Sequence, residues 1–152
     1  MGRHLGVWAI VGALVLGAAA VGGAYVTASS GGDDPEQLAL GREVYGEACA
    51  SCHGANLEGQ PNWRVRQANG RLPAPPHDAS GHTWHHPDQI LFDITKQGVA
   101  AFAPERYESD MPAFAETLSD DQIWAVLAYI KSTWPEEIRA QQERLSERYL
   151  GN

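Results

Sequence analysis

The sequence predicts an all-α fold. Apolar residues recur at helical spacings in several segments after residue 33, no segment alternates apolar and polar residues as a strand does, and no internal repeat is visible. The first thirty residues differ so strongly in composition from the rest that we expect one small folded domain within the 152 residues.

The N-terminal segment, residues 1–28, is predicted to be a membrane anchor or a signal peptide. Leu5 to Val26 contains no charged residue, and Arg3 precedes it. Its 22 residues reach the roughly 20 that a membrane-spanning helix needs and exceed the roughly 7–15 of a secretory apolar core. We therefore favour an uncleaved anchor. Residues 18–20 and 26–28 each offer a small-x-small cleavage site, which keeps the signal peptide open as the alternative.

Both alternatives export the rest of the chain, because the positive-inside rule holds Arg3 in the cytoplasm. We expect the domain on the periplasmic side of the inner membrane or, after cleavage, free in the periplasm. All 19 acidic residues follow residue 32 and the net charge is −8, so nucleic acid is not expected as a partner. Such a surface suits either a basic patch on a partner protein or simple solubility.

Residues 29–35 are predicted to form a flexible linker, and residues 36–134 the folded domain. We expect the first helix from about residue 36 to 48, because an apolar stripe with a helical period follows Pro35. The stripe consists of Leu38, Gly41, Val44 and Tyr45. The 34 residues from Gly54 to Pro87 hold five of the nine prolines and no sustained period. So long a loop is expected where it wraps around something other than protein.

Two further helices are predicted after the long loop. The first begins with Pro87 at its first position, has Lys96 in its last turn and ends at Gly98. The second begins with the capping-box pair Ser119 and Gln122. It continues with an apolar face that consists of Ile123, Val126, Leu127 and Ile130.

A last helix is predicted in residues 135–152, from Glu136 to about Tyr149, with acidic residues at its start and arginines near its end. Ile138, Leu145 and Tyr149 give it only a narrow apolar stripe. We therefore expect this helix on the surface of the domain.

The chemistry is carried by residues 49–53, Cys-Ala-Ser-Cys-His, which form the C-x-x-C-H signature of haem attachment. Thiols at this spacing can reach the two vinyl groups on one edge of a porphyrin, and the next residue can turn its imidazole to the iron. The sequence thus predicts one haem c, held covalently by Cys49 and Cys52, with His53 as an axial ligand. The alternatives are a thioredoxin-like pair, which lacks its strands, a zinc site with His82 and His86, far away in the sequence, and a chance match.

A second axial ligand is expected from Met111, because the only other methionine is the initiator. Pro112 disfavours helix at Met111 and stiffens the loop ahead of the helix at Ser119. A thioether ligand raises the reduction potential relative to ligation by two histidines. The alternative is that Met111 only fills a gap in the packing.

With these features the sequence resembles a class I cytochrome c over about residues 36 to 133. The order of elements is the same: helix, C-x-x-C-H, proline-rich loop, short helix, Met-Pro loop and closing helix. The resemblance implies a cytochrome c fold, with helices wrapped around one covalent haem and the first and last helices crossing. Gly41 and Tyr45 match one side of that crossing, and Val126 and Tyr129 match the other.

The resemblance also implies a proline carbonyl that receives the N–H of the proximal imidazole. Pro75 or Pro76 would fill this role toward His53. The choice stays open, because the family's Gly-Pro-x-Leu wording is absent from this sequence.

Two stretches, residues 63–66 and 82–86, are absent from the shortest family members. They offer Arg64, Arg66 and Trp84 as contacts for the haem propionates. The alternative for the arginines is that they are solvated loop residues.

The function implied by the resemblance is electron transfer in a respiratory or related chain, and not an enzymatic reaction on a small-molecule substrate. Its partners would be redox proteins, among them membrane respiratory complexes. One alternative is a small haem enzyme or sensor, such as a peroxidase, with an open sixth position at the iron. The other is a copper-handling haem protein. Its copper ligands would be His77, His82, His85, His86 and Met111.

Overall fold

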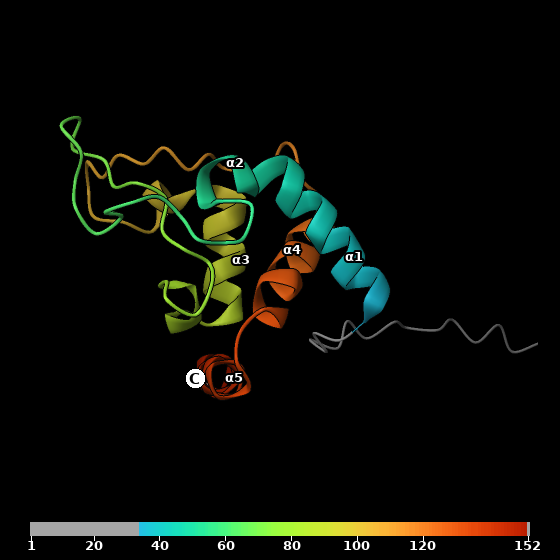
Figure 1. Ribbon diagram of the computed structural model, residues 1–152. Coiled ribbons are helices and arrows are strands. Elements are labelled where there is room, and N and C mark those ends of the chain that lie inside the picture. Colours follow the sequence, from blue (N-terminus) through green and yellow to red (C-terminus); the bar gives the residue numbers. More distant parts are fainter. Residues whose placement is uncertain (1–33, 152) are drawn as a thin grey trace, which may run out of the picture.

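A computed structural model describes residues 34–151 of the chain (Figure 1). The predicted anchor or signal peptide, residues 1–28, and residues 29–33 of the predicted linker lie outside the described residues. The described part is helical and holds no strand, as predicted. In order, its elements are α1 (Pro35–Val44), the π-helical turn η1 (Tyr45–Cys49), α2 (Ala50–His53), the 3₁₀ turn η2 (Thr83–His85), α3 (Asp88–Gln97), the 3₁₀ turn η3 (Val99–Ala101), α4 (Asp120–Ser132) and α5 (Glu136–Leu150). Within residues 34–151, no helix is long and apolar enough to cross a membrane.

The helices α1, η1 and α2 form one continuous helical run. The Asp34 side chain caps its start by accepting a hydrogen bond from the Glu36 N–H at 3.1 Å. The run ends at Gly54, whose φ of +83° is easily adopted only by glycine. The predicted helix end at residue 48 is wrong, because the π-helical turn continues the helix through the C-x-x-C-H motif.

The first helix crosses α4 in close contact (Figure 1). A Cβ atom added to the buried Gly41 would lie 2.6 Å from the carbonyl carbon of Ala125 and 2.8 Å from the Cβ of Tyr129. A side chain at position 41 would therefore hold the two backbones apart. The rings of Tyr45 and Tyr129 lie 5.6 Å apart at the same crossing. The predicted crossing of the first and closing helices is confirmed.

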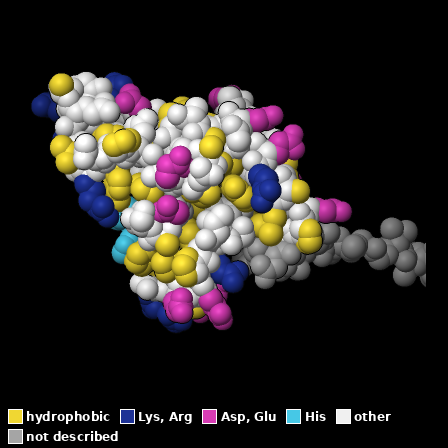
Figure 2. Space-filling view, viewed as in Figure 1, with side chains coloured by type: hydrophobic (Ala, Val, Ile, Leu, Met, Phe, Trp, Pro, Cys, Tyr) yellow, Lys and Arg dark blue, Asp and Glu magenta, His cyan; other side chains and the backbone are white. Residues whose placement is uncertain are grey.

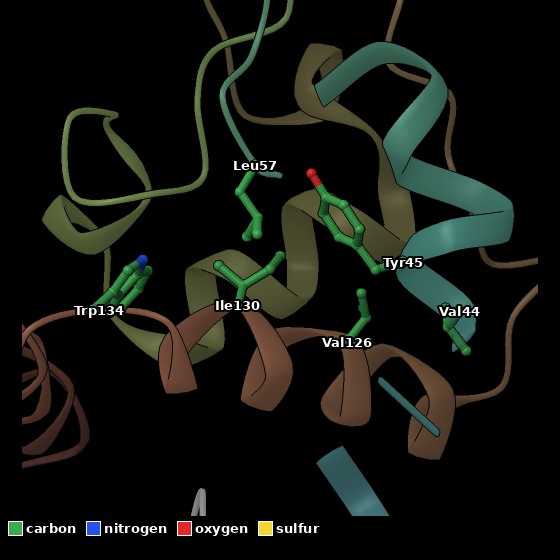
Figure 3. Close-up of a cluster of buried hydrophobic side chains, with 6 residues drawn as sticks. All are labelled: Val44, Tyr45, Leu57, Val126, Ile130 and Trp134. Atoms are coloured by element: carbon green, nitrogen blue, oxygen red, sulfur yellow. The ribbon is translucent and has the colours of Figure 1, made fainter. Parts of the chain in front are cut away.

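A set of buried side chains, which we call the core cluster, joins the first helical run to α4 (Figure 3). Its members are Val44, Tyr45, Leu57, Val126, Ile130 and Trp134. Each is at most 5 % exposed, and burial of one such side chain contributes about 1.5–3 kcal/mol to folding. Leu57 belongs to the long loop, so the loop begins inside the core. A second cluster joins α3 to α4, and its members are Leu91, Phe92, Ile123 and Leu127.

The predicted starts of α3 and α4 are close to the observed ones. Pro87 is the residue before α3 and not its first helical residue, which is Asp88. The capping box of α4 is confirmed: the Ser119 hydroxyl accepts from the Gln122 N–H at 3.2 Å, and the Gln122 side chain accepts from the Ser119 N–H at 3.0 Å.

The C-terminal helix α5 begins where predicted, but its buried face is polar. Gln142 is fully buried and donates to the carboxylate of Asp88 at 2.7 Å, while the Ser146 hydroxyl accepts from the Asp88 N–H at 3.0 Å. Lys131 of α4 binds the same carboxylate at 2.8 Å. Tyr149 is 46 % exposed, and most other residues of α5 are exposed as well, so the helix lies on the surface as predicted. Hydrogen bonds let these polar groups replace apolar ones at the contact with α3.

Candidate functional site

The imidazole of His53 is held at the end of α2 by the backbone of the long loop. Its side chain is buried, and its Nδ1–H donates to the carbonyl oxygen of Pro75 at 2.8 Å. The structure therefore places Pro75, and not Pro76, opposite this imidazole. Burial lowers the pKa of His53, and the hydrogen bond to Pro75 opposes that shift. A neutral imidazole whose Nδ1 is occupied presents its Nε2 lone pair to a metal.

The two cysteines lie on the same helical run, three residues apart, and both are free thiols. Cys52 is exposed and Cys49 is partly buried. Burial, with a smaller effect from Cys52, raises the pKa of Cys49 to about 11. Both thiols are thus free, on the helical run whose last residue is His53.

The loop around His53 is fixed by hydrogen bonds to its backbone. The Gly59 N–H donates to the carbonyl oxygen of His53 at 2.7 Å, and the Tyr45 hydroxyl donates to that of Gly54 at 2.8 Å. Further along, the His77 N–H donates to the Leu57 carbonyl at 2.8 Å. Hydrogen bonds from the helical run and from the loop itself therefore hold the loop backbone around His53.

His77, which the sequence offers as a copper ligand in one alternative, lies beside His53. Its ring stacks on that of His53, with 3.9 Å between the centroids and 22° between the planes. Its Nδ1 lies 2.7 Å from the Thr83 hydroxyl, and the Trp134 indole N–H donates to its carbonyl at 2.7 Å. Burial, and next the nearby His53, lower the pKa of His77 to about 3, so the ring is neutral at pH 7. The only sequence signal was its position two residues after Pro75.

The remaining histidines of the predicted metal cluster lie together at the end of the loop. The His82 ring is 5.2 Å from that of His85 and 4.8 Å from that of His86. Within residues 34–151, however, no three or more His, Cys, Asp or Glu side chains are arranged to hold a metal ion. The structure gives no support to the zinc site or to the copper site, and it directs His77 toward His53 instead.

The three residues predicted to contact the haem propionates make the following contacts within the chain. The Trp84 indole N–H donates to the Ala79 carbonyl at 3.2 Å, and this side chain packs against the core cluster. The Arg64 guanidinium lies 3.9 Å from the centroid of the Trp63 ring. Arg66 donates to the Gly70 carbonyl at 2.6 Å.

The predicted sixth ligand, Met111, lies on the segment between η3 and α4 and is partly buried. Its N–H donates to the Ser109 hydroxyl at 3.1 Å. As predicted from Pro112, the chain is not helical here.

The donor set described above fits haem c. The thiols are free, and the imidazole beside them is buried, neutral and oriented through its Nδ1. A helical domain with this arrangement belongs to the class of proteins that attach haem through two cysteines.

The comparison with protein families gives the same result at the level of the whole domain. The family model for cytochrome c matches residues 38–134, and the chain belongs to the cytochrome c family. It is a haem electron-transfer protein, and its cofactor is haem c, bound covalently through the C-x-x-C-H motif. No curated protein and no solved structure gave a significant match.

Proposed function

We propose that this protein is a single-electron carrier of a respiratory or related chain, with His53 and Met111 as the two axial ligands of its iron. The haem supplies the ferrous–ferric couple. His53 and Met111 would hold the iron of the bound haem and would leave no position on it for a substrate. On this proposal the protein is not an enzyme.

The observation that carries the His53 assignment is the hydrogen bond from its Nδ1–H to Pro75. Because a backbone carbonyl can only accept, it fixes the tautomer that has a free lone pair on Nε2. It also fixes the plane of the ring, and it makes the imidazole a better donor to the iron.

Met111 is supported as the second ligand by the contacts of one competitor, His77, and by its own uniqueness. The ring of His77 stacks on that of His53, the proposed first ligand, and its Nδ1 is already engaged with the Thr83 hydroxyl. Met111 is the only methionine other than the initiator. Its soft thioether favours the ferrous state and raises the reduction potential.

Replacement of Met111 with alanine tests this assignment. We expect the variant to lose the near-infrared charge-transfer band of sulfur-ligated ferric haem, to show a lower reduction potential and to bind carbon monoxide when reduced. The wild type and a Glu116→Ala control, at an exposed position of the same segment, should keep the band and resist carbon monoxide. A wild type that binds carbon monoxide readily, or a spectrum unchanged in Met111→Ala, would contradict the proposal and favour a haem enzyme or sensor.

We also propose that residues 1–28 anchor the protein in the inner membrane, with the haem domain on the periplasmic side. The uncharged stretch from Leu5 to Val26 supports an anchor by its length. This position would bring the domain close to membrane respiratory complexes as redox partners. Membrane fractionation with N-terminal sequencing tests the anchor, and a soluble periplasmic product that begins near residue 21 or 29 would contradict it.

A further inference from the structure

The loop of residues 60–74 is an arginine-bearing Ω-loop that lies over the segment carrying Met111. Its ends are joined by two hydrogen bonds, from the Gln60 N–H to the Ala74 carbonyl at 2.8 Å and from the Ala74 N–H to the Gln60 side chain at 3.0 Å. It contains three arginines and no acidic residue. The loop and the segment between η3 and α4 run side by side in Figure 1, and Figure 2 shows Lys and Arg side chains at this end of the molecule.

Arg71 of this loop bridges to the Met111 segment through two carboxylates. Its Nε lies 3.3 Å from Glu108, and its Nη1 binds Asp110, which directly precedes Met111. The backbone of Arg71 is itself fixed, because its N–H donates to Asn69 at 2.9 Å and its carbonyl accepts from the Gln67 N–H at 2.9 Å. The Arg71 guanidinium thus extends from a turn whose backbone is fixed by hydrogen bonds.

A second contact between the same two segments supports this arrangement. The Arg66 guanidinium lies 5.5 Å from the centroid of the Tyr107 ring. Together, Arg66 and Arg71 contact three residues in the four positions before Met111. The Ω-loop therefore fixes the chain on the N-terminal side of Met111.

The C-terminal side of Met111 is fixed separately. The Phe114 N–H donates to the Thr95 carbonyl at 3.1 Å, and the Ala115 N–H donates to the Lys96 carbonyl at 3.0 Å. These bonds tie the chain to the end of α3. Met111 therefore lies on a short segment held at both sides, by backbone bonds on one side and by Arg71 on the other.

We propose that Arg71 is a positioning residue for Met111. By pairing with Glu108 and Asp110 it would keep the thioether within bonding distance of the iron. This inference rests on the proposed ligation by Met111. Without Arg71 the N-terminal side of the segment loses its two ion pairs with the Ω-loop and is held less firmly, so the sulfur leaves the iron more often. A competing ligand should then bind the iron more tightly, because its apparent affinity depends on the fraction of protein in which Met111 has left.

The test is a titration of the ferric holoprotein with imidazole, followed by loss of the near-infrared band. We expect Arg71→Gln to raise the apparent affinity for imidazole by about threefold to tenfold, as expected for the loss of exposed ion pairs. The imidazole affinity of Arg71→Lys should lie between those of the wild type and Arg71→Gln, since a point charge cannot bridge two carboxylates as a guanidinium does. The matched control is Arg106→Gln, which removes the same charge from an exposed position in the Met111 segment.

Each outcome bears on one claim. A rise in Arg71→Gln that Arg106→Gln does not share supports the positioning role. A wild type that shows the near-infrared band while Arg71→Gln and Arg106→Gln bind imidazole equally would overturn that role and leave the ligand assignment intact. A wild type without the band would overturn the ligation by Met111, and the role of Arg71 with it.

Discussion

Replacement of Gly41 with alanine is expected to destabilise the domain by forcing α1 and α4 apart. The added Cβ would lie 2.6 Å from the Ala125 carbonyl carbon and 2.8 Å from the Tyr129 Cβ, and these atoms cannot rotate away. We expect this clash to lower the free energy of unfolding by about 3 kcal/mol, the upper end of the usual cost of overpacking a core. The higher helix propensity of alanine than of glycine offsets about 1 kcal/mol of this loss. The expected net loss is about 2 kcal/mol, or roughly 8 °C in Tm for a domain of this size.

The matched control is Gly46→Ala, because nothing lies within 4 Å of a Cβ added at position 46. That variant should be as stable as the wild type or gain up to about 1 kcal/mol from the helix preference of alanine. Urea unfolding of both holoproteins, followed by circular dichroism, measures the difference. Equal stability of Gly41→Ala and Gly46→Ala would refute the reasoning, since it would mean that the two helices do not approach as closely as described.

Three further outcomes are expected. Gln142→Ala should lower the free energy of unfolding by about 1–3 kcal/mol, because buried hydrogen-bonding groups lose their partner. At the exposed position 141, Gln141→Ala should change it by less than about 0.5 kcal/mol. Equal effects of the two variants in urea unfolding would contradict the contribution of the buried polar contacts of α5. The pKa of His77 falls from 6.5 to about 3 on folding. Between pH 6.5 and pH 3 the unfolded chain therefore binds a proton at His77 that the folded chain does not bind. The free energy of unfolding should then decrease toward pH 3 by at most about 1.36 kcal/mol per pH unit. His77→Leu should flatten this profile in unfolding experiments, and an identical profile would count against the buried neutral ring. Replacement of both Cys49 and Cys52 with serine should remove haem that survives denaturing electrophoresis and leave the chain largely unfolded by circular dichroism; retained haem would contradict attachment through these thiols.

The sequence predicted those parts of the fold that depend on local rules. The capping box at Ser119 and the apolar face of α4 follow from side-chain chemistry within one turn of helix. The close crossing at Gly41 was expected from the resemblance to class I cytochromes c, which have a small residue at this crossing, and not from a local rule. The helix end at residue 48 could not, because a π-helical turn leaves no periodic signal in a segment of five residues.

The parts that the sequence did not reveal depend on contacts between distant segments. The last helix was expected on the surface as a whole, and the burial of its Gln142 depends on the pairing with Asp88, 54 positions earlier. In the same way, His77 was grouped with its neighbours in sequence, but the fold stacks it on His53. The bridge from Arg71 to the Met111 segment spans 37 to 39 positions and has no local signature.

The most direct test of the account is the proton NMR spectrum of the reduced holoprotein with isotope-labelled methionine methyl groups. The chain has two methionines, so the assignment needs only one variant, Met111→Ala. If Met111 closes the iron, one methyl signal should be shifted far upfield by the ring current of the haem, and it should vanish in the variant. Methyl signals that all lie at ordinary shifts in the wild type would show that the sulfur is not on the iron and would contradict the proposed electron carrier.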